Sequence, residues 1–286
     1  MFSVIIPLYN KELSIKHTIQ SVLKQTIQDF EIVIVNDGST DDSAKIVEGI
    51  NDSRVRLIHQ KNKGVSAARN YGVEKACNQW VAFLDGDDLW EVNHLEEITK
   101  MMSVFPNEKF YVTSFKYSDD RKISKCPRQT SIFKIENYFE EVLVEELICT
   151  GIVVVDKNCF NKVGGFNKNL NLGEDLDLWA RLAHKYEIIK SSVVTATYRV
   201  EAENRSSLSK EVKNTCVYHF KLSPTLDLAE KKYYKELILS HIFQYFVALD
   251  YLNVMKLKNR HPNISYNETI CYISKRVKLK ISKKLA

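Results

Sequence analysis

The sequence predicts an α/β fold with a mostly parallel central sheet, followed by a helical C-terminal region. Short apolar segments alternate with amphipathic segments through roughly the first 90 residues, which is typical of βαβ units. Two acidic turns, at residues 36–38 and 85–88, each follow a predicted strand. From about residue 210 the apolar residues recur at three- and four-residue intervals, which indicates helices.

The N-terminal part contains four predicted strands and three helices between them. The strands are residues 2–9, 31–36, 55–59 and 80–84, and the helices are residues 12–25, 41–50 and 65–77. Residues 31–36 (EIVIVN) form an apolar run without alternation, which favours a strand covered on both faces. Because ligands of such sheets bind beyond the carboxyl ends of the strands, we expect functional residues there.

The remaining chain is less regular. We predict strands at 110–117, 151–155 and 188–198, helices at 135–147, 156–163 and 173–185, and polar loops at 118–129 and 201–209. A long helical stretch covers 227–258, and an amphipathic helix covers 270–285. These patterns divide the chain into an α/β domain, residues 1–205, and a helical region, residues 206–286, with a basic amphipathic tail.

Charge is distributed unevenly. The net charge is +5, but residues 210–286 carry 15 basic and 6 acidic side chains, whereas residues 1–209 carry 26 basic and 30 acidic ones. The two regions therefore present different surfaces and suit different partners. Nucleic acid is disfavoured as a partner, because the positive charge is terminal and no segment resembles a nucleic-acid-binding module.

Targeting signals are not found. The apolar run at residues 2–8 is too short for a secretory signal and has no basic flank, and no run approaches the ~18 apolar residues of a membrane span. The six cysteines are scattered without a CxxC pair, which favours reduced thiols over a disulfide framework or a zinc site. We therefore expect a cytoplasmic protein.

The strongest local motif is Asp85-Gly86-Asp87-Asp88, directly after a predicted strand. Carboxylates are hard oxygen ligands that suit Mg2+ or Mn2+. A cation held there would bind a diphosphate and neutralise the charge that builds as the diphosphate leaves. The alternative is a solvated turn, since Asp and Gly are common turn residues.

A second motif, Asn36-Asp37-Gly38, follows the second strand. An acid at this place in a nucleotide-binding half commonly bonds a ribose or a base edge, although a helix-capping turn explains it equally well. The turn after the first strand carries neither a GxGxxG fingerprint nor a P-loop.

A third motif places three acids, Glu174, Asp175 and Asp177, at the start of a predicted helix. Acids there are favoured by the helix dipole, which is the simpler explanation. A carboxylate fixed at a helix start in a cleft can also act as a general base. The residue types alone do not choose between the two.

Six segments occur in a fixed order along the chain: FSVIIPLYN, IVIVNDGSTDDS, NKGVSAARN, FLDGDD, VGGF and GEDLDLW. In this order they resemble the inverting family 2 glycosyltransferases of bacterial surface-polysaccharide synthesis, which have the GT-A fold. The resemblance spans roughly residues 2–200 and implies a Rossmann-like, mostly parallel sheet.

The resemblance also implies roles for individual residues. It places Asp175 as the base that deprotonates the acceptor hydroxyl, and Glu174 as a residue that orients or binds the acceptor. Asp85 and Asp87 correspond to the DxD element, with Asp87 a direct metal ligand and Asp85 nearer the ribose and the metal's waters. Trp179 is expected beneath the site, and Gly164-Gly165 at a turn near the donor sugar. The expected nucleotide-sugar-binding residues are Pro7, Tyr9, Asp37, Asn62, Arg69, Asp85 and Asp87.

The implied reaction moves a hexose or N-acetylhexosamine from a UDP-sugar to an acceptor hydroxyl with inversion, and requires Mn2+ or Mg2+. The implied acceptor is a lipid-linked surface glycan. A tail at 270–286 that lies on the inner face of the cytoplasmic membrane would suit this acceptor. The alternative is a solvated helix whose Ile/Val stripe packs on the protein.

The sequence departs from the family pattern in places. Many relatives carry a basic residue or His in the loop after the last catalytic strand, and here Arg199 and Arg205 are both candidates for the pyrophosphate. There is no QxxRW element, which favours a single-sugar transferase over a processive polymerase. The rival functions are a sugar-phosphate nucleotidyltransferase, which would need a Gly-rich loop near residues 8–12, and an inactive nucleotide- and membrane-binding scaffold. The donor sugar, acceptor, linkage and oligomeric state are not specified by the sequence.

Overall fold

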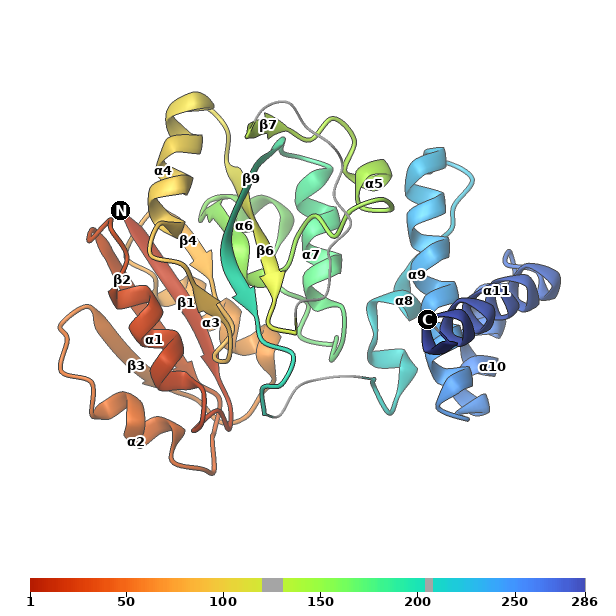
Figure 1. Ribbon diagram of the computed structural model, residues 1–286, viewed down its shortest axis with the longest axis horizontal. Coiled ribbons are helices and arrows are strands. Elements are labelled where there is room, and N and C mark those ends of the chain that lie inside the picture. Colours follow the sequence, from red (N-terminus) through yellow and green to blue (C-terminus); the bar gives the residue numbers. More distant parts are fainter. Residues whose placement is uncertain (120–130, 204–207, 286) are drawn as a thin grey trace. The chain divides into compact units, whose positions relative to one another are not determined.

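A computed structural model describes residues 1–119, 131–203 and 208–285. The chain forms two compact units (Figure 1). Unit 1 comprises Met1–Lys168 and Glu174–Arg205, and unit 2 comprises Asn169–Gly173 and Ser206–Ala286. The short segment Asn169–Gly173 belongs to unit 2 because Leu172 forms a β-bridge with Thr215 and the Asn171 N–H donates to the Asn214 carbonyl at 2.7 Å.

Unit 1 is built on one sheet, which counts nine strands among the described residues. The strand order is β3-β2-β1-β4-β8-β6-β9-β5, with β7 also paired to β9. The strands are β1 Phe2–Leu8, β2 Phe30–Asn36, β3 Val55–His59, β4 Trp80–Phe83, β5 Leu89–Trp90, β6 Phe110–Tyr117, β7 Ile132–Lys134, β8 Val153–Asp156 and β9 Ile188–Tyr198.

The first four strands pair in parallel, and helices α1 (Ile15–Leu23), α2 (Ser43–Glu48) and α3 (Val65–Lys75) connect them. Right-handed crossovers of this kind bring the carboxyl ends of β1, β2 and β4 to one edge. The predicted α/β fold is thus confirmed. Beyond β4 the sheet is mixed, because β8 runs antiparallel to both of its neighbours while β6 and β9 are parallel.

Helices cover both faces of the sheet. On one face α3 lies so close to β1 that a Cβ on Gly72 would come within 2.3 Å of Ile5 Cγ2. On the same face the Trp179 ring of α7 (Glu174–Ala183) packs against Phe83 of β4 and Phe110 of β6. Helices α1 and α4 (His94–Val104) cover the other face. The result is a sheet buried on both sides.

Some predicted elements are shorter or interrupted. The helix predicted at 135–147 is only α5 (Tyr138–Glu141), whose first turn is capped by Asn137. The strand predicted at 151–155 begins later, after a 3-10 turn η1 (Thr150–Ile152), and α6 (Cys159–Val163) follows it. Most of the loop predicted at 118–129 lies outside the described residues.

Unit 2 is helical. It contains η2 (Val212–Asn214), α8 (Cys216–His219), α9 (Leu228–Val247), α10 (Tyr251–Arg260) and α11 (Tyr266–Leu285). The single helical stretch predicted at 227–258 is therefore wrong in one respect: the chain breaks at Leu249, whose φ is 60°, and the Asp250 side chain caps α10. Within the described part of the chain, no helix is long and apolar enough to cross a membrane.

Candidate active site

Asp37 organises the turn at the end of β2, where the sequence predicts a nucleotide. Its Oδ1 accepts from Gln60 Nε2 at 2.6 Å and from the Lys63 N–H at 2.8 Å, and its Oδ2 accepts from the Gly64 N–H at 2.8 Å. Gly64 caps α3 with a φ of 86°. The carboxylate therefore fixes the turn that starts α3 as well as lying at the strand end where a ribose is expected.

The other residues predicted to border the nucleotide lie along the same edge. Pro7 is the next-to-last residue of β1, and Tyr9, which follows this strand, is 43% exposed. Asn62 is exposed, and its backbone nitrogen would lie 3.0 Å from a Cβ on Gly38. The structure thus brings the predicted residues of β1, β2 and the turn before α3 to one edge of the sheet.

Arg69 of α3 joins two of the three acidic motifs. Its Nη2 donates to Asp85 Oδ1 at 2.6 Å and its Nη1 donates to Glu174 Oε1 at 2.8 Å. The guanidinium is only 3% exposed. Burial opposes its positive charge, but the carboxylates of Asp85 and Glu174 raise the pKa of Arg69 above its usual range. Arg69 therefore remains charged and holds the end of β4 beside the start of α7.

Asp175 lies next to this ion pair. Burial and the adjacent Glu174 carboxylate raise the pKa of Asp175 to about 6, although Arg69 opposes the rise. Its Oδ1 accepts the Leu176 N–H at 2.8 Å. A carboxylate with a pKa near neutrality can take a proton from a bound hydroxyl, which is what a general base requires.

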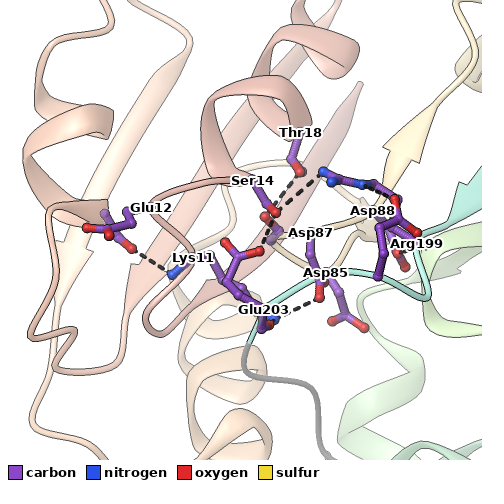
Figure 2. Close-up of polar contacts among 12 residues, drawn as sticks. Lys11, Glu12, Ser14, Thr18, Asp85, Asp87, Asp88, Arg199 and Glu203 are labelled. Atoms are coloured by element: carbon purple, nitrogen blue, oxygen red, sulfur yellow. Dashed lines mark hydrogen bonds and ion pairs between the residues drawn. The ribbon is translucent and has the colours of Figure 1, made fainter.

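Asp87 interacts with a residue from the turn after β1. Lys11 Nζ donates to Asp87 Oδ2 at 2.7 Å and also to the Glu203 carbonyl (Figure 2). Burial, together with repulsion from Asp85, raises the pKa of Asp87, and Lys11 opposes this rise. The Ser14 hydroxyl donates to Glu203 Oε2 at 2.7 Å. Together with the bond from Lys11, this contact holds the segment after β9 beside the turn that follows β1.

Arg199 and Asp88 complete this side of the site. The Arg199 backbone N–H donates to Asp88 Oδ1 at 2.9 Å, while the Arg199 guanidinium donates to Glu201 at 3.1 Å and to Ser14 at 3.4 Å (Figure 2). Of the two arginines predicted for a pyrophosphate, Arg199 is thus beside the acidic motif, and Arg205 lies outside the described residues.

Sequence reasoning did not identify Lys11, Ser14 or Glu203 as members of the site. Only one signal was present: Lys11 directly follows the turn at the end of the first strand. Its partner Asp87 is 76 residues away, and Glu203 is 192 residues away. Pairings at that separation are set by the sheet topology and leave no local pattern in the sequence.

The carboxylate oxygens of Asp85 and Asp87 are the kind of ligand atom that a divalent cation prefers. These oxygens are hard ligands, and the Lys11 ammonium against Asp87 shows that this carboxylate already accepts a positive charge. In the described parts of unit 1 and unit 2, no group of three or more His, Cys, Asp or Glu side chains could hold a metal. The pair therefore fits a cation that takes its other ligands from a bound molecule or from water.

Comparison with known proteins identifies the class. A family model described as Glycosyl transferase family 2 matches residues 3–164. This match covers more than half of the chain, and the chain belongs to this family.

Individual relatives are similar over part of their length. An uncharacterized glycosyltransferase from Rickettsia bellii (strain RML369-C) is 31% identical over 208 residues, which are 72% of this chain and 30% of the relative. A chondroitin synthase from Escherichia coli is 31% identical over 190 residues, which are 64% of this chain and 26% of that protein. The chain thus spans less than a third of the length of each.

Solved structures share the fold. S. aureus TarS 1-349 in complex with UDP-GlcNAc superposes with a TM-score of 0.62 at 20% identity, covering 93% of this chain and 74% of that chain. The same protein in complex with UDP gives a TM-score of 0.61 at 18% identity, covering 93% and 92%. The predicted GT-A fold with a helical C-terminal region is confirmed.

The raised pKa of Asp175 predicts an effect on stability. The carboxyl has an ordinary pKa of 3.8 and a folded pKa of about 6, so keeping it ionised in the fold costs stability above pH 6 and costs nothing below pH 4. We expect Asp175→Asn to stabilise the protein at pH 8 by on the order of 1–3 kcal/mol, nearer the lower end because the side chain is half-buried. The gain should vanish near pH 4, as measured by urea unfolding.

Asp52→Asn is the matched control with the opposite sign. Hydrogen bonds from Arg54 lower the pKa of Asp52 to about 2, so this substitution should destabilise the protein at pH 8. If Asp175→Asn also destabilised it at pH 8, the environment inferred for Asp175 would be incorrect.

Proposed function

We propose that the protein is an inverting glycosyltransferase that moves a hexose or N-acetylhexosamine from a UDP-sugar to an acceptor hydroxyl. Membership of family 2 supports sugar transfer. The complexes of S. aureus TarS with UDP-GlcNAc and UDP, on the same fold, support a UDP-sugar as the donor.

The observation that carries the proposal is the Arg69 bridge. One guanidinium spans Asp85 at the end of β4 and Glu174 at the start of α7. It thereby holds Asp85, a candidate ligand for the cation that would bind the diphosphate, near Asp175, the candidate base. Inversion needs this arrangement, with a base on one side of the anomeric carbon and the leaving group on the other.

The proposed step follows from these positions. The acceptor oxygen forms a bond to the anomeric carbon while its proton passes to the Asp175 carboxylate. The bond between the anomeric carbon and the diphosphate oxygen breaks, and UDP leaves with the electron pair. A Mg2+ or Mn2+ ion held by Asp85 and Asp87 would neutralise the charge of the departing diphosphate. No enzyme nucleophile is required.

The test is UDP release from a panel of UDP-sugars in the presence of Mn2+, with and without EDTA. We expect release from one UDP-sugar that is sensitive to EDTA and lost in Asp87→Ala. Asp175→Asn should lower transfer by about 100-fold or more, the usual contribution of a general base. Asp42→Asn, an exposed acid outside the site, is the control and should leave release unchanged.

The same assay separates the alternatives. A sugar-phosphate nucleotidyltransferase would release pyrophosphate, and an inactive scaffold would release nothing. If transfer persisted in Asp175→Asn, that residue would not be the base. If no UDP-sugar were turned over, the proposed donor class would be wrong.

We further propose that the acceptor is a lipid-linked glycan and that α11 lies on the anionic inner face of the cytoplasmic membrane. Two residues of the apolar stripe of this helix are exposed, Ile270 by 60% and Val277 by 36%. The exposed side chains Lys275, Arg276 and Lys278 lie beside it, and no acidic residue follows Glu268. An apolar stripe edged by cations fits an anionic lipid surface.

Vesicle co-sedimentation tests this contact. We expect the full chain to bind phosphatidylcholine vesicles containing about 30% phosphatidylglycerol, and binding to fall when salt is raised. Lys275→Glu with Lys278→Glu should abolish binding. Lys221→Glu with Lys232→Glu, two exposed lysines of unit 2 outside α11, should keep most of it. Equal loss in both pairs would contradict a specific role for α11.

A further inference from the structure

The loop between α6 and α7 is held to α3 by a single amide. Asn70 Nδ2 donates to the Phe166 carbonyl at 2.8 Å, and Asn70 Oδ1 accepts the Phe166 N–H at 2.8 Å. Both polar backbone atoms of Phe166 are thus bonded to one side chain. This two-point contact fixes the height and the orientation of the Phe166 backbone above α3.

The contact depends on the residue before Phe166. A Cβ on Gly165 would lie 2.3 Å from Asn70 Oδ1 and 2.9 Å from Asn70 Cγ. No real side chain tolerates that approach, so any larger residue here must push the Asn70 amide away from Phe166.

Arg181 of α7 holds the same loop from the other side. Its Nη1 donates to the Val163 carbonyl at 2.6 Å, and its Nη2 donates to the Gly165 carbonyl at 2.9 Å. Its Nε and Nη2 also donate to Asp177 Oδ2, at 3.0 and 2.7 Å, one turn earlier on α7. The loop is therefore fixed to α7 as well as to α3.

The Phe166 side chain links the fixed loop to Arg69 of the candidate active site. Its ring lies 5.1 Å from the Arg69 guanidinium and 5.3 Å from the Phe83 ring, centre to centre. Arg69 in turn bridges Asp85 and Glu174. These contacts form a closed network. It runs from Asn70 of α3 to the loop, from the loop to α7, and from Glu174 of α7 back to α3 through Arg69.

We propose that Asn70 and Arg181 are positioning residues for sugar transfer. By fixing the loop Val163–Phe166 they set the place of the Phe166 ring, which supports Arg69, and so the separation between Asp85 and the Glu174-Asp175 pair. The inference rests on the proposed function. In this proposal both residues act through Arg69, whose displacement by about 1 Å would cost on the order of 100-fold in rate.

The test is a double-substitution cycle on UDP-sugar turnover with Asn70→Ala, Gly165→Ala and the two combined. Each single change breaks the same pair of hydrogen bonds, so each should lower kcat by about 10- to 100-fold, with KM for the UDP-sugar changed less than about 3-fold. Because Asn70→Ala removes the atoms that a Cβ on Gly165 would strike, the combined variant should be no worse than about 2-fold below the poorer single one.

Arg181→Lys provides an independent measurement, with Arg54→Lys as its matched control. Arg54 pairs with Asp52 through the same two nitrogens, Nε at 3.0 Å and Nη2 at 2.7 Å, but far from the loop. Arg181→Lys keeps the charge beside Asp177 and loses the paired carbonyl contacts, so kcat should fall about 10-fold or more. Arg54→Lys should leave kcat unchanged.

Three results would overturn the inference. One is multiplication of the two single losses in the combined variant, and another is unchanged kcat in Asn70→Ala or Arg181→Lys. The third is a loss of kcat that only follows a loss of folded protein, as read from the melting temperature. A wild-type protein that turns over no UDP-sugar would refute the proposed function, which is a separate failure visible before any variant is made.

Discussion

A single buried guanidinium, that of Arg69, balances the charge of one buried carboxylate, Glu174, and one half-buried carboxylate, Asp85. Charged groups leave water at a large free-energy cost unless they are paired and hydrogen-bonded. Arg69 pays that cost for Asp85 and Glu174 together, and it also opposes the rise in the pKa of Asp175. Burial is the main cause that raises the pKa values of Asp175 and Asp87, and the neighbouring carboxylates of Glu174 and Asp85, respectively, add to the rise.

The charged groups of the site are brought together by contacts between elements that are far apart in the sequence. Parallel pairing of β1, β2 and β4 carries the acids that follow β2 and β4 to one edge, and α7 packs its Trp179 ring on the same face as α3. Lys11, near the start of unit 1, then donates both to Asp87 and to the carbonyl of Glu203, near the end of the unit. The charged groups come from several elements, including the turns after β1 and β4 and the helices α3 and α7, so their positions depend on the packing of the whole unit.

The sequence was sufficient for the parallel half of the sheet, because apolar runs and strand-end acids are local patterns. The strand-end patterns also drew attention to Asp37, Asp85 and Asp87, and the family resemblance to Asp175; the roles of these four residues stay predictions. The sequence could not predict which acids Arg69 would bridge, since they lie 16 and 105 residues away. The break of the long C-terminal helix at Leu249 was missed for a different reason: a non-glycine residue with φ of 60° gives no compositional sign.

The central claim is that Arg69 stabilises acids that would otherwise be buried unpaired. The most direct measurement is the free energy of unfolding in urea at pH 7.5 for wild type, Arg69→Met and Arg69→Met with Glu174→Gln. Removing one partner of a buried pair typically costs about 3–5 kcal/mol, so Arg69→Met should lose that amount, and neutralising Glu174 should restore at least about 1 kcal/mol. If Arg69→Met unfolded within about 0.5 kcal/mol of wild type, or if Glu174→Gln restored nothing, the Arg69 bridge would not be the interaction on which the site depends.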